Sequence, residues 1–271
     1  MGHSTAHAEN QVFKKNFAIA DEYGATARAI LSAQLEEFVL HLSKSGERLT
    51  PAEVSEAYAE VFGTGLISNE FLDICRRLYS ISALGIPQSG VEIARNSVAF
   101  TDNIFSSAAA EKLCPDAVKE HFSDFRSACE AVFYEKCDCC ILPVYGTDDG
   151  FFPTFFKLIK AYELKICRVC TVEKPSSDAE IRYALLTRSV NFDGAERFVF
   201  SFADSGERLA GLLAVLGGAG CAPAFIYSFP DVYNTDMTEY TVCLRLSGLD
   251  ARCLAFFLEA ALPAHTVVGT Y

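Results

Sequence analysis

Tryptophan is absent from this 271-residue chain, methionine occurs twice, and 23 lysines and arginines stand against 35 aspartates and glutamates. The formal net charge of -12 leaves no basic footprint of the kind that nucleic acids and anionic membranes need. We therefore expect no nucleic-acid partner and no membrane partner. An anionic small molecule would need a local cluster of arginines, lysines or backbone N–H groups. Because 51% of the residues are hydrophobic, the chain is typical of a folded globular protein.

Long apolar runs are also missing. The best of them, Cys253 to Leu262, is interrupted by Glu259 and is too short to span a bilayer. The first residues, MGHSTAHAENQ, have no apolar core of the kind found in a signal peptide. Ala6 also stands where a myristoylation signal has serine or threonine. We expect residues 1–11 to be a disordered lead-in to a cytoplasmic protein.

Cysteine, by contrast, occurs 11 times. The closely spaced groups that resemble metal or redox sites in composition are Cys137, Cys139 and Cys140, and Cys167 with Cys170. The last pair lies in an expected strand, where residues three apart point to opposite faces and cannot grip one ion together. We therefore expect buried free thiols, no metal and no cofactor.

Residues 12–90 are expected to form an all-helical unit. Apolar residues recur at helical spacing over 12–43. A second helix stops at Gly63, and its start signals are an N-cap, a first-turn proline and a capping-box glutamate: Thr50, Pro51 and Glu53. A third helix is expected to begin near Ser68, and a linker rich in glycine and proline follows it. The unit is expected to pack as a bundle or as a dimerisation element.

Residues 97–191 alternate between strand and helix patterns. The expected strands are Val98–Phe100, Ala117–His121, Cys139–Val144, Leu164–Val172 and Ile181–Val190. The expected helices are Phe105–Leu113, a helix capped by Ser123 that runs to Tyr134 with Phe133 inward, and Phe151–Tyr162. This alternation predicts a largely parallel sheet with its ligand at the strand tips. The tips carry turn or polar residues: Thr101-Asp102-Asn103, Tyr145 to Gly150, and Thr187-Arg188.

Residues 196–271 follow a different order, β-α-β-β-α-β, which predicts a ferredoxin-like unit. Gly217, Gly218 and Gly220 end a helix in this unit and match no nucleotide-binding fingerprint. The expected fold class is therefore α/β and α+β multidomain. It has an N-terminal helical unit, a one-lobed strand–helix sheet domain and a C-terminal ferredoxin-like domain.

Five stretches resemble the motifs of one known family. VAFTDNIFSSAAAEKLCPDA is similar to its first strand, loop and Tyr-Ser helix start, with Phe105-Ser106 in that place. CILPVYGTDDG resembles its Leu-Pro-Ile-Glu-Asn-Ser motif and following glycine, and Leu186-Thr187-Arg188-Ser189 resembles its Thr-Arg-Phe signature. Gly206-Glu-Arg-Leu209 and Tyr227-Ser228-Phe229-Pro230 fall where the family has Gly-Ala-Leu and Glu-Ser-Arg-Pro. The last two units thus resemble a prephenate dehydratase followed by its regulatory ACT domain.

The resemblance implies a catalytic site for the loss of CO2 and a hydroxyl from prephenate, which gives phenylpyruvate. It places Thr187 as the donor to the leaving oxygen, Arg188 as a fork for a carboxylate and Thr147 as a further hydrogen-bonding group. The residues that it implies for substrate binding are Ser106, Phe105 and Gly150.

For the C-terminal unit the resemblance implies phenylalanine sensing. The implied effector-binding residues are Gly206, Leu209, Ser228 and Pro230. Because ACT domains of this kind bind their effector at a dimer interface, we expect a homo-oligomer, a homodimer formed through the ACT-like unit, with allosteric behaviour. Tyr227 and Phe229 replace the acidic and basic residues of the family motif, and such aromatics can instead fill the ligand space of a plain dimerisation module.

One departure from the family divides the functional hypotheses. The family inserts a second lobe before its Thr-Arg-Phe signature, whereas this chain has only a turn and the start of a strand there. The first hypothesis is a prephenate dehydratase, a carbon–oxygen lyase of phenylalanine synthesis, with a shortened catalytic domain. The alternative is a catalytically silent aromatic amino-acid sensor or assembly protein. The two differ in whether Thr187 and Arg188 line a closed pocket with Thr147.

Overall fold

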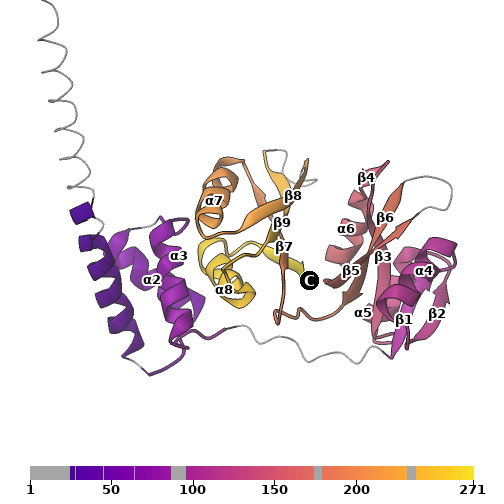
Figure 1. Cartoon of the computed structure of the whole chain (residues 1–271), viewed down its shortest axis with the longest axis horizontal. Helices are drawn as coiled ribbons and strands as arrows, with labels where there is room; N and C mark the ends of the chain where they lie inside the picture. The colour runs from indigo at the N-terminus through magenta and orange to yellow at the C-terminus, as the bar shows by residue number, and fades with distance from the viewer. Residues whose placement is uncertain are drawn as a thin grey trace, which may run out of the picture.

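The computed structural model describes residues 25–27, 29–44, 46–63, 65–86, 96–173, 179–230 and 236–271. The lead-in expected over 1–11, the first half of the helix expected over 12–43 and most of the linker lie outside these residues. Figure 1 shows three groups of elements in a row. The group in the middle of the row is the last one in the sequence, and it lies between the N-terminal helices and the strand–helix unit.

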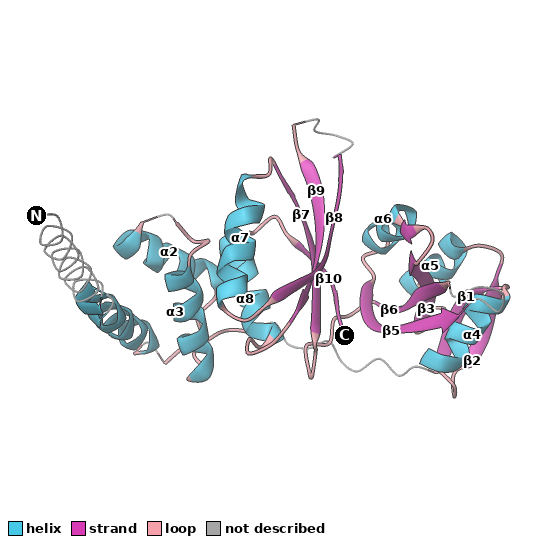
Figure 2. Cartoon of the chain, turned by 45° about the horizontal axis from the view of Figure 1, so that its top comes forward, coloured by secondary structure: helices cyan, strands magenta, loops and turns pink. Residues whose placement is uncertain are grey.

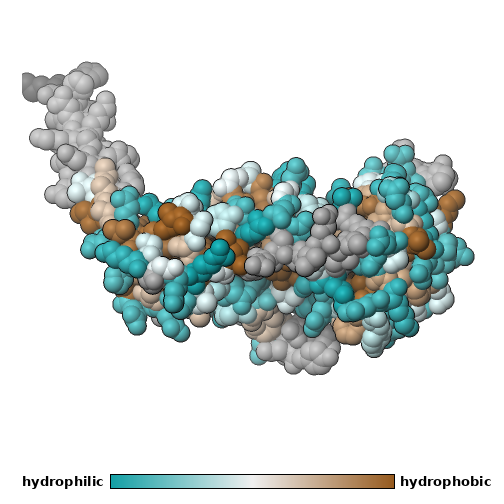
Figure 3. Space-filling model, turned by 90° about the horizontal axis from the view of Figure 1, so that it is seen from below, coloured by the Kyte–Doolittle hydropathy of each residue, from teal (hydrophilic) through white to brown (hydrophobic). Residues whose placement is uncertain are grey.

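The helices expected in the N-terminal part are confirmed within the described residues. Residues 29–43 are helical, followed by α2 (Pro51–Phe62) and α3 (Asn69–Ser80). The Thr50 side chain and the Glu53 side chain form the predicted capping box, and Gly63 ends α2 with a φ of 92° that favours glycine. Ser68 caps α3 by accepting from the Phe71 N–H. Figure 3 shows hydrophobic side chains gathered over this helical part, where Ile30, Leu40 and Val61 are exposed.

The strand–helix unit supplies one end of a ten-stranded sheet, in the order β2-β1-β3-β6-β5, and the sheet continues through β10 (Thr266–Thr270) into the C-terminal unit. The elements of the strand–helix unit are β1 (Ser97–Thr101), α4 (Ile104–Leu113), β2 (Val118–Phe122), α5 (Phe125–Phe133), β3 (Cys139–Gly146), β4 (Gly150–Phe151), α6 (Pro153–Ala161), β5 (Lys165–Glu173) and β6 (Glu180–Thr187). The predicted parallel pairing holds for β1 with β2 and with β3. However, β6 is antiparallel to both β3 and β5. The carboxyl ends of β1 and β3 therefore lie beside the start of β6, not beside its end.

Three local predictions in this unit were wrong. Asp124, not Ser123, caps α5, because its carboxylate accepts from the Ser127 N–H. Phe133 is 42% exposed instead of inward, since it lies at the last residue of that helix. The helix expected from Phe151 begins at Pro153, because residues 150–151 pair with β3 as the short strand β4.

The two faces of this sheet are covered by different helices. On one face, α4 covers a buried cluster that includes Phe100, Ile141 and Leu185. On the other face, α5 and α6 cover a cluster that includes Leu142 and Leu186. Alternate residues of β3 and β6 thus serve opposite cores, as expected for strands buried on both faces.

The C-terminal unit has the predicted order β-α-β-β-α-β. Its elements are β7 (Arg197–Asp204), α7 (Glu207–Gly218), β8 (Ala222–Pro230), β9 (Thr238–Arg245), α8 (Ala251–Ala261) and β10 (Thr266–Thr270). The strands lie in the order β10-β7-β9-β8, and all three pairings are antiparallel. Figure 2 shows α7 and α8 on the same side of this sheet. The multidomain α/β and α+β class is therefore confirmed, with a ferredoxin-like C-terminal unit.

The helical part and the C-terminal unit share one buried core. Phe71 of α3 lies 5.9 Å from Phe257 of α8, measured between ring centroids, and both side chains are fully buried. The same cluster runs from residues of the first helix, such as Leu35, through α2 to Phe200 of β7. The division of the chain at residues 12–90, 97–191 and 196–271 stays a prediction, and packing groups its first and last parts together.

The C-terminal unit meets the strand–helix unit where β10 pairs with β5 in parallel, at Gly269 and Ile166. A Cβ atom on Gly269 would lie 2.3 Å from the Ile166 carbonyl oxygen, so only glycine allows this approach. Among the described residues, no helix is long and apolar enough to cross a membrane.

Candidate functional site

A buried group of hydroxyls lies at the carboxyl end of β1. The Thr101 and Ser106 hydroxyls are 3.1 Å apart, and the Asn103 amide donates to them at 2.7 and 2.9 Å. Asn103 also caps α4 by accepting from the Ser106 N–H at 2.8 Å. Ser106 is fully buried, and the neighbouring Phe105 packs against the core under α4. These polar atoms satisfy one another, which holds the start of α4 in place.

The tip of β3 lies beside the start of β6. The Thr147 hydroxyl accepts from the Glu180 N–H at 2.9 Å, and the Thr147 N–H donates to the Glu180 carbonyl at 3.0 Å. Next to this contact, the Arg182 guanidinium lies 5.1 Å from the centroid of the Tyr145 ring. Gly150 follows the turn with a φ of 71° and opens β4. This tip therefore presents a cation over an aromatic ring.

Thr187 and Arg188 lie at the other end of β6. Thr187 is seven residues beyond Glu180, which is about 23 Å along the strand at a rise of ~3.3 Å per residue. The Thr187 hydroxyl donates to the Ser189 carbonyl at 2.8 Å, and Arg188 forms an ion pair with Glu135. The structure does not bring the predicted catalytic residues together, because β6 separates Thr147 from the other two.

Arg188 instead lines a cavity of about 300 Å³ between α6, the start of β5 and β10. Lys165 shares this cavity, and its ammonium donates to the Val267 carbonyl at 2.7 Å. Burial lowers the pKa of Lys165. Both cations are already held by protein oxygens, and Thr147 is not part of this cavity.

The predicted effector residues lie at one end of the ferredoxin-like sheet, with one exception. Pro230 pairs with Thr238, and Thr238 pairs with Asp204 two residues before Gly206. Ser228 precedes this point on β8, the edge strand of the sheet. The buried Asp204 carboxylate accepts from the Gly206 N–H at 3.0 Å, and Gly206 has a φ of 106°. The exception, Leu209, packs into the core under α7.

Sequence reasoning missed two residues at the β3 tip, Arg182 and Tyr183. Arg182 is exposed above Tyr145, whereas Tyr183 is buried on the opposite face of β6 beside α4. Burial raises the pKa of Tyr183, and its hydrogen bond with Ser106 partly offsets this rise. The signal was present in the short turn expected over Glu173 to Asp178, because a turn this short joins antiparallel strands.

The cysteines are free thiols, and burial raises the pKa of several, including Cys140 and Cys170. The prediction that Cys167 and Cys170 point to opposite faces was wrong. The β5–β6 register shifts between Ile166 and Arg168, so Cys167 is the extra residue of a bulge. Both thiols therefore pack against the core under α4. Within the described ranges, no three His, Cys, Asp or Glu side chains are grouped to hold a metal.

The fold is similar to that of solved prephenate dehydratases. The structure of the Streptococcus mutans enzyme matches with a TM-score of 0.54 and 15% identity, over 65% of this chain and 97% of that one. The Arthrobacter aurescens enzyme, solved in complex with L-Phe, matches with a TM-score of 0.53 and 15% identity, over 65% and 89%. A structure described as GqqA, a novel type of quorum quenching acylase, matches with a TM-score of 0.56 and 15% identity, over 66% and 95%.

No protein-family model and no curated protein sequence matches the chain. At these identities, the likeness shows that the chain has a prephenate-dehydratase-like fold and leaves its chemistry to the arrangement of its own residues.

Proposed function

We propose that this chain is a catalytically silent relative of the prephenate dehydratases that senses an aromatic amino acid. The observation that carries the proposal is the separation of Thr147 from Thr187 and Arg188 by the length of β6. A single prephenate molecule cannot reach both ends of the strand. The hydroxyl and the guanidinium expected to act on it are also engaged with Ser189 and Glu135.

A second observation supports the loss of catalysis. The Arg182-Tyr183 pair lies beside the β3 tip, so we propose that it corresponds to the Arg-Phe of the family signature. Ile181 then stands in the place of the threonine. A side chain without a hydroxyl cannot donate a proton to the leaving oxygen of prephenate. A one-lobed catalytic part would also leave this tip open to solvent.

The C-terminal unit is proposed to be the sensing part, an ACT-like domain. Its end near Gly206 and Pro230 offers backbone groups and the side chain of Tyr240, which pairs with Ser228 and lies beside Gly206. The rings of Tyr227 and Phe229 lie 5.8 Å apart on the other face of β8, where Tyr227 packs against Phe151. Edge strand β8 exposes Ile226 by 40% and has no partner on its outer side among the described strands. An open apolar edge of this kind supports pairing with a second copy, which gives the proposed homodimer.

L-phenylalanine binding tests the sensing proposal. We expect isothermal titration calorimetry to detect binding of L-phenylalanine to the full chain. Ser228→Phe is expected to abolish this binding, because it places a bulky ring among the proposed effector-binding residues. Ser123→Phe introduces the same side chain at an exposed position of the strand–helix unit and is expected to leave binding unchanged. Absence of binding to the wild-type chain at millimolar ligand would overturn the sensing proposal.

One observation favours a second candidate, prephenate dehydration at the β3 tip. Arg182 lies over Tyr145 and Thr147 binds the Glu180 backbone at this tip, so they offer a cation for a carboxylate and a hydroxyl for the leaving group. This candidate predicts that Arg182→Gln abolishes the formation of phenylpyruvate from prephenate, while Arg188→Gln retains it. Equal loss in both variants would contradict this candidate.

A further inference from the structure

A groove of about 530 Å³ lies on the N-terminal helical part, between the first helix (residues 29–43) and α2. Its floor is formed by Phe38 and Leu42 of the first helix and by Ala57 and Phe62 of α2. The Phe38 and Phe62 rings meet edge to face, with their centroids 5.4 Å apart. All four side chains belong to, or pack against, the core that is shared with the C-terminal unit. The floor is therefore apolar and is held in place by the core beneath it.

The groove is open to solvent along both helices. Gln34, Glu37 and His41 line one rim, and Ile30 lies one turn before Gln34 on the same side of the first helix. This side runs for about 16 Å, at a rise of ~1.5 Å per residue. Val61 of α2 lines the facing rim and is 63% exposed. Figure 3 shows hydrophobic side chains gathered over this part. A long apolar strip at the surface is typical of a protein interaction site.

Both rims of the groove are acidic. Glu37 lies on the rim of the first helix and Glu60 on the rim of α2, and both side chains are exposed. Glu56 and Glu53 lie one and two turns before Glu60 on the same side of α2 and are exposed as well. None of the described residues that line the groove is a lysine or an arginine. Charge complementarity therefore favours an occupant with positive charge along its flanks.

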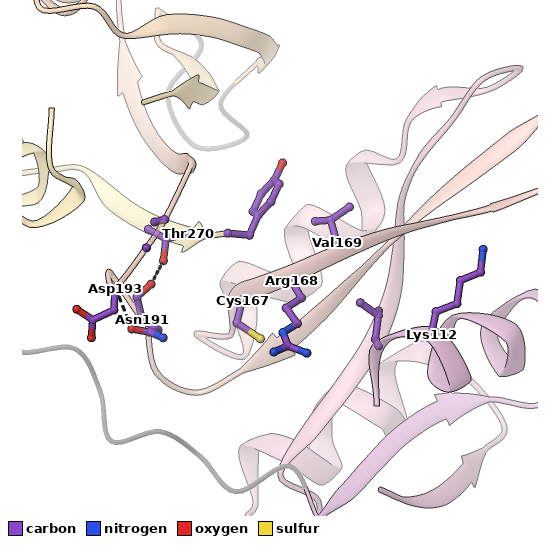
Figure 4. A pocket seen from close by; sticks show the side chains of 11 residues that line it. Lys112, Cys167, Arg168, Val169, Asn191, Asp193 and Thr270 are labelled. Atoms are coloured by element: carbon purple, nitrogen blue, oxygen red, sulfur yellow. Dashed lines mark hydrogen bonds between the residues drawn. The ribbon is translucent and has the colours of Figure 1, made fainter. Parts of the chain in front are cut away.

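A cavity of about 450 Å³ beside the pairing of β10 with β5 lacks this organisation. Figure 4 shows the Lys112 side chain pointing away from Arg168. The Lys112 ammonium donates to the Thr171 carbonyl at 2.9 Å, and Asp193 forms an ion pair with Arg252. The charged groups of that cavity therefore do not converge on one ligand.

We propose that the groove binds an amphipathic helix of a partner protein, whose apolar face is flanked by lysine or arginine. The apolar side chains of such a helix recur every three or four residues, so they fill the strip over Phe38 and Phe62 and contact Val61. Its basic side chains lie beside Glu37 and Glu60. The groove belongs to the helical part, whereas the proposed amino-acid site and the β8 edge belong to the C-terminal unit. The inference therefore does not depend on the proposed function.

The test is fluorescence anisotropy of a labelled helical peptide that has leucine on one face and lysine on the other, titrated with the full chain. A twin peptide with glutamate in place of each lysine tests the role of charge. We expect the lysine peptide to bind at least about tenfold more tightly than the glutamate peptide. This ratio is expected to shrink as salt is added, because the charged rims are exposed.

Two pairs of variants locate the binding. Val61→Ser is expected to weaken binding of the lysine peptide about tenfold, because it removes apolar contact. Its control is Val118→Ser, because Val118 is 65% exposed on β2, in the strand–helix unit. Glu60→Lys is expected to weaken binding about tenfold at low salt, because it replaces attraction with repulsion. Glu120→Lys makes the same change at an exposed residue of β2. Both controls are expected to leave binding unchanged.

The proposal is overturned if the lysine peptide does not bind, if the two peptides bind equally, or if Val61→Ser or Glu60→Lys binds as the wild-type chain does. It is also overturned if either control weakens binding as much as its counterpart. Sedimentation velocity of the chain alone tests a second copy as the occupant. Self-association that Val61→Ser abolishes would overturn the proposal, because the groove would then bind another copy of the chain. Absence of phenylalanine binding would overturn the proposed function alone.

Discussion

The two faces of the C-terminal sheet are joined to the rest of the chain in different ways. Its helix-covered face shares a continuous core with α2 and α3, although 100 or more residues separate them in the sequence. Its β10 edge pairs with β5, and its open face adds three buried residues to the cluster under α5 and α6. Parts that are neighbours in the sequence are therefore not the ones that pack together: the N-terminal helices pack with the last unit instead of the next one.

The open face of the C-terminal sheet shares few buried residues with the strand–helix unit. Val199, Cys243 and Val268 are the buried C-terminal residues that join the cluster under α5 and α6. Beyond them, the Phe151 and Phe225 rings lie 4.4 Å apart and Lys160 forms an ion pair with Glu239. Cavities of about 450 and 300 Å³ adjoin this connection. A narrow connection with cavities beside it can open and close far more easily than a packed core.

The largest loss of stability is expected from truncating a side chain in the core on the helix-covered face. Phe71→Ala should lower the free energy of unfolding by about 3–5 kcal/mol, because it leaves a cavity between Tyr58 and Phe257. Urea denaturation measures this loss. Phe133→Ala on α5 is the matched control and should cost much less, because Phe133 is 42% exposed. Equal losses in the two variants would contradict a shared core.

A substitution at Gly269 should weaken the pairing of β10 with β5, because the two backbones approach closely there. Gly269→Ala places a methyl group 2.3 Å from the Ile166 carbonyl oxygen, so β10 must move away from β5. We expect a loss of about 3 kcal/mol in the free energy of unfolding. Gly217→Ala in α7 meets no atom within 4 Å and should raise stability by about 0.5–1 kcal/mol. Retention of wild-type stability by Gly269→Ala would show that the close approach is not needed.

His265, which precedes β10, should make the free energy of unfolding fall at acidic pH. Burial lowers the pKa of His265 below 6.5, and the ring is 3% exposed beside the Leu262 carbonyl. The unfolded chain then binds more protons than the folded one below pH 6.5, so stability falls as the pH drops from 6.5 toward the folded-state pKa. His265→Asn should remove part of this fall in urea denaturation across that range. An unchanged pH profile would exclude His265 as its source.

The smallest effect is expected at Ser201, on the open face beside Val199. Within the described residues, its hydroxyl is the buried side-chain oxygen without a hydrogen-bond partner. Ser201→Ala should therefore raise the free energy of unfolding by about 1 kcal/mol. Ser97→Ala should have the opposite sign, because the Ser97 hydroxyl accepts from the Asp138 N–H at 3.0 Å. A destabilised Ser201→Ala would mean that its hydroxyl is satisfied in solution.

Much of the fold followed from local patterns in the sequence. The capping box at Thr50 and Glu53 and the cap at Ser68 set the starts of α2 and α3 correctly, because these signals act within one helical turn. The order of the last six elements was also correct. What local patterns could not give was the packing of α3 on α8, since Phe71 and Phe257 are far apart in sequence and either could have served another partner.

The candidate site was harder to predict for a topological reason. Placing Thr187 with Thr147 required β6 to run parallel to β3, whereas the register pairs Gly146 with Ile181 at the start of β6. The turn before β6 already contained this information. The bulge at Cys167 could not be predicted from the sequence of β5, because a bulge depends on pairing across strands and not on the residues of one strand.

The most direct test of the account is the incubation of the wild-type chain with prephenate while phenylpyruvate is measured. The separation of Thr147 from Thr187 along β6 predicts no phenylpyruvate beyond the uncatalysed background. Turnover by the wild-type chain above this background would contradict the account. Its disappearance in Thr187→Ala would further mean that the two ends of β6 act on one substrate.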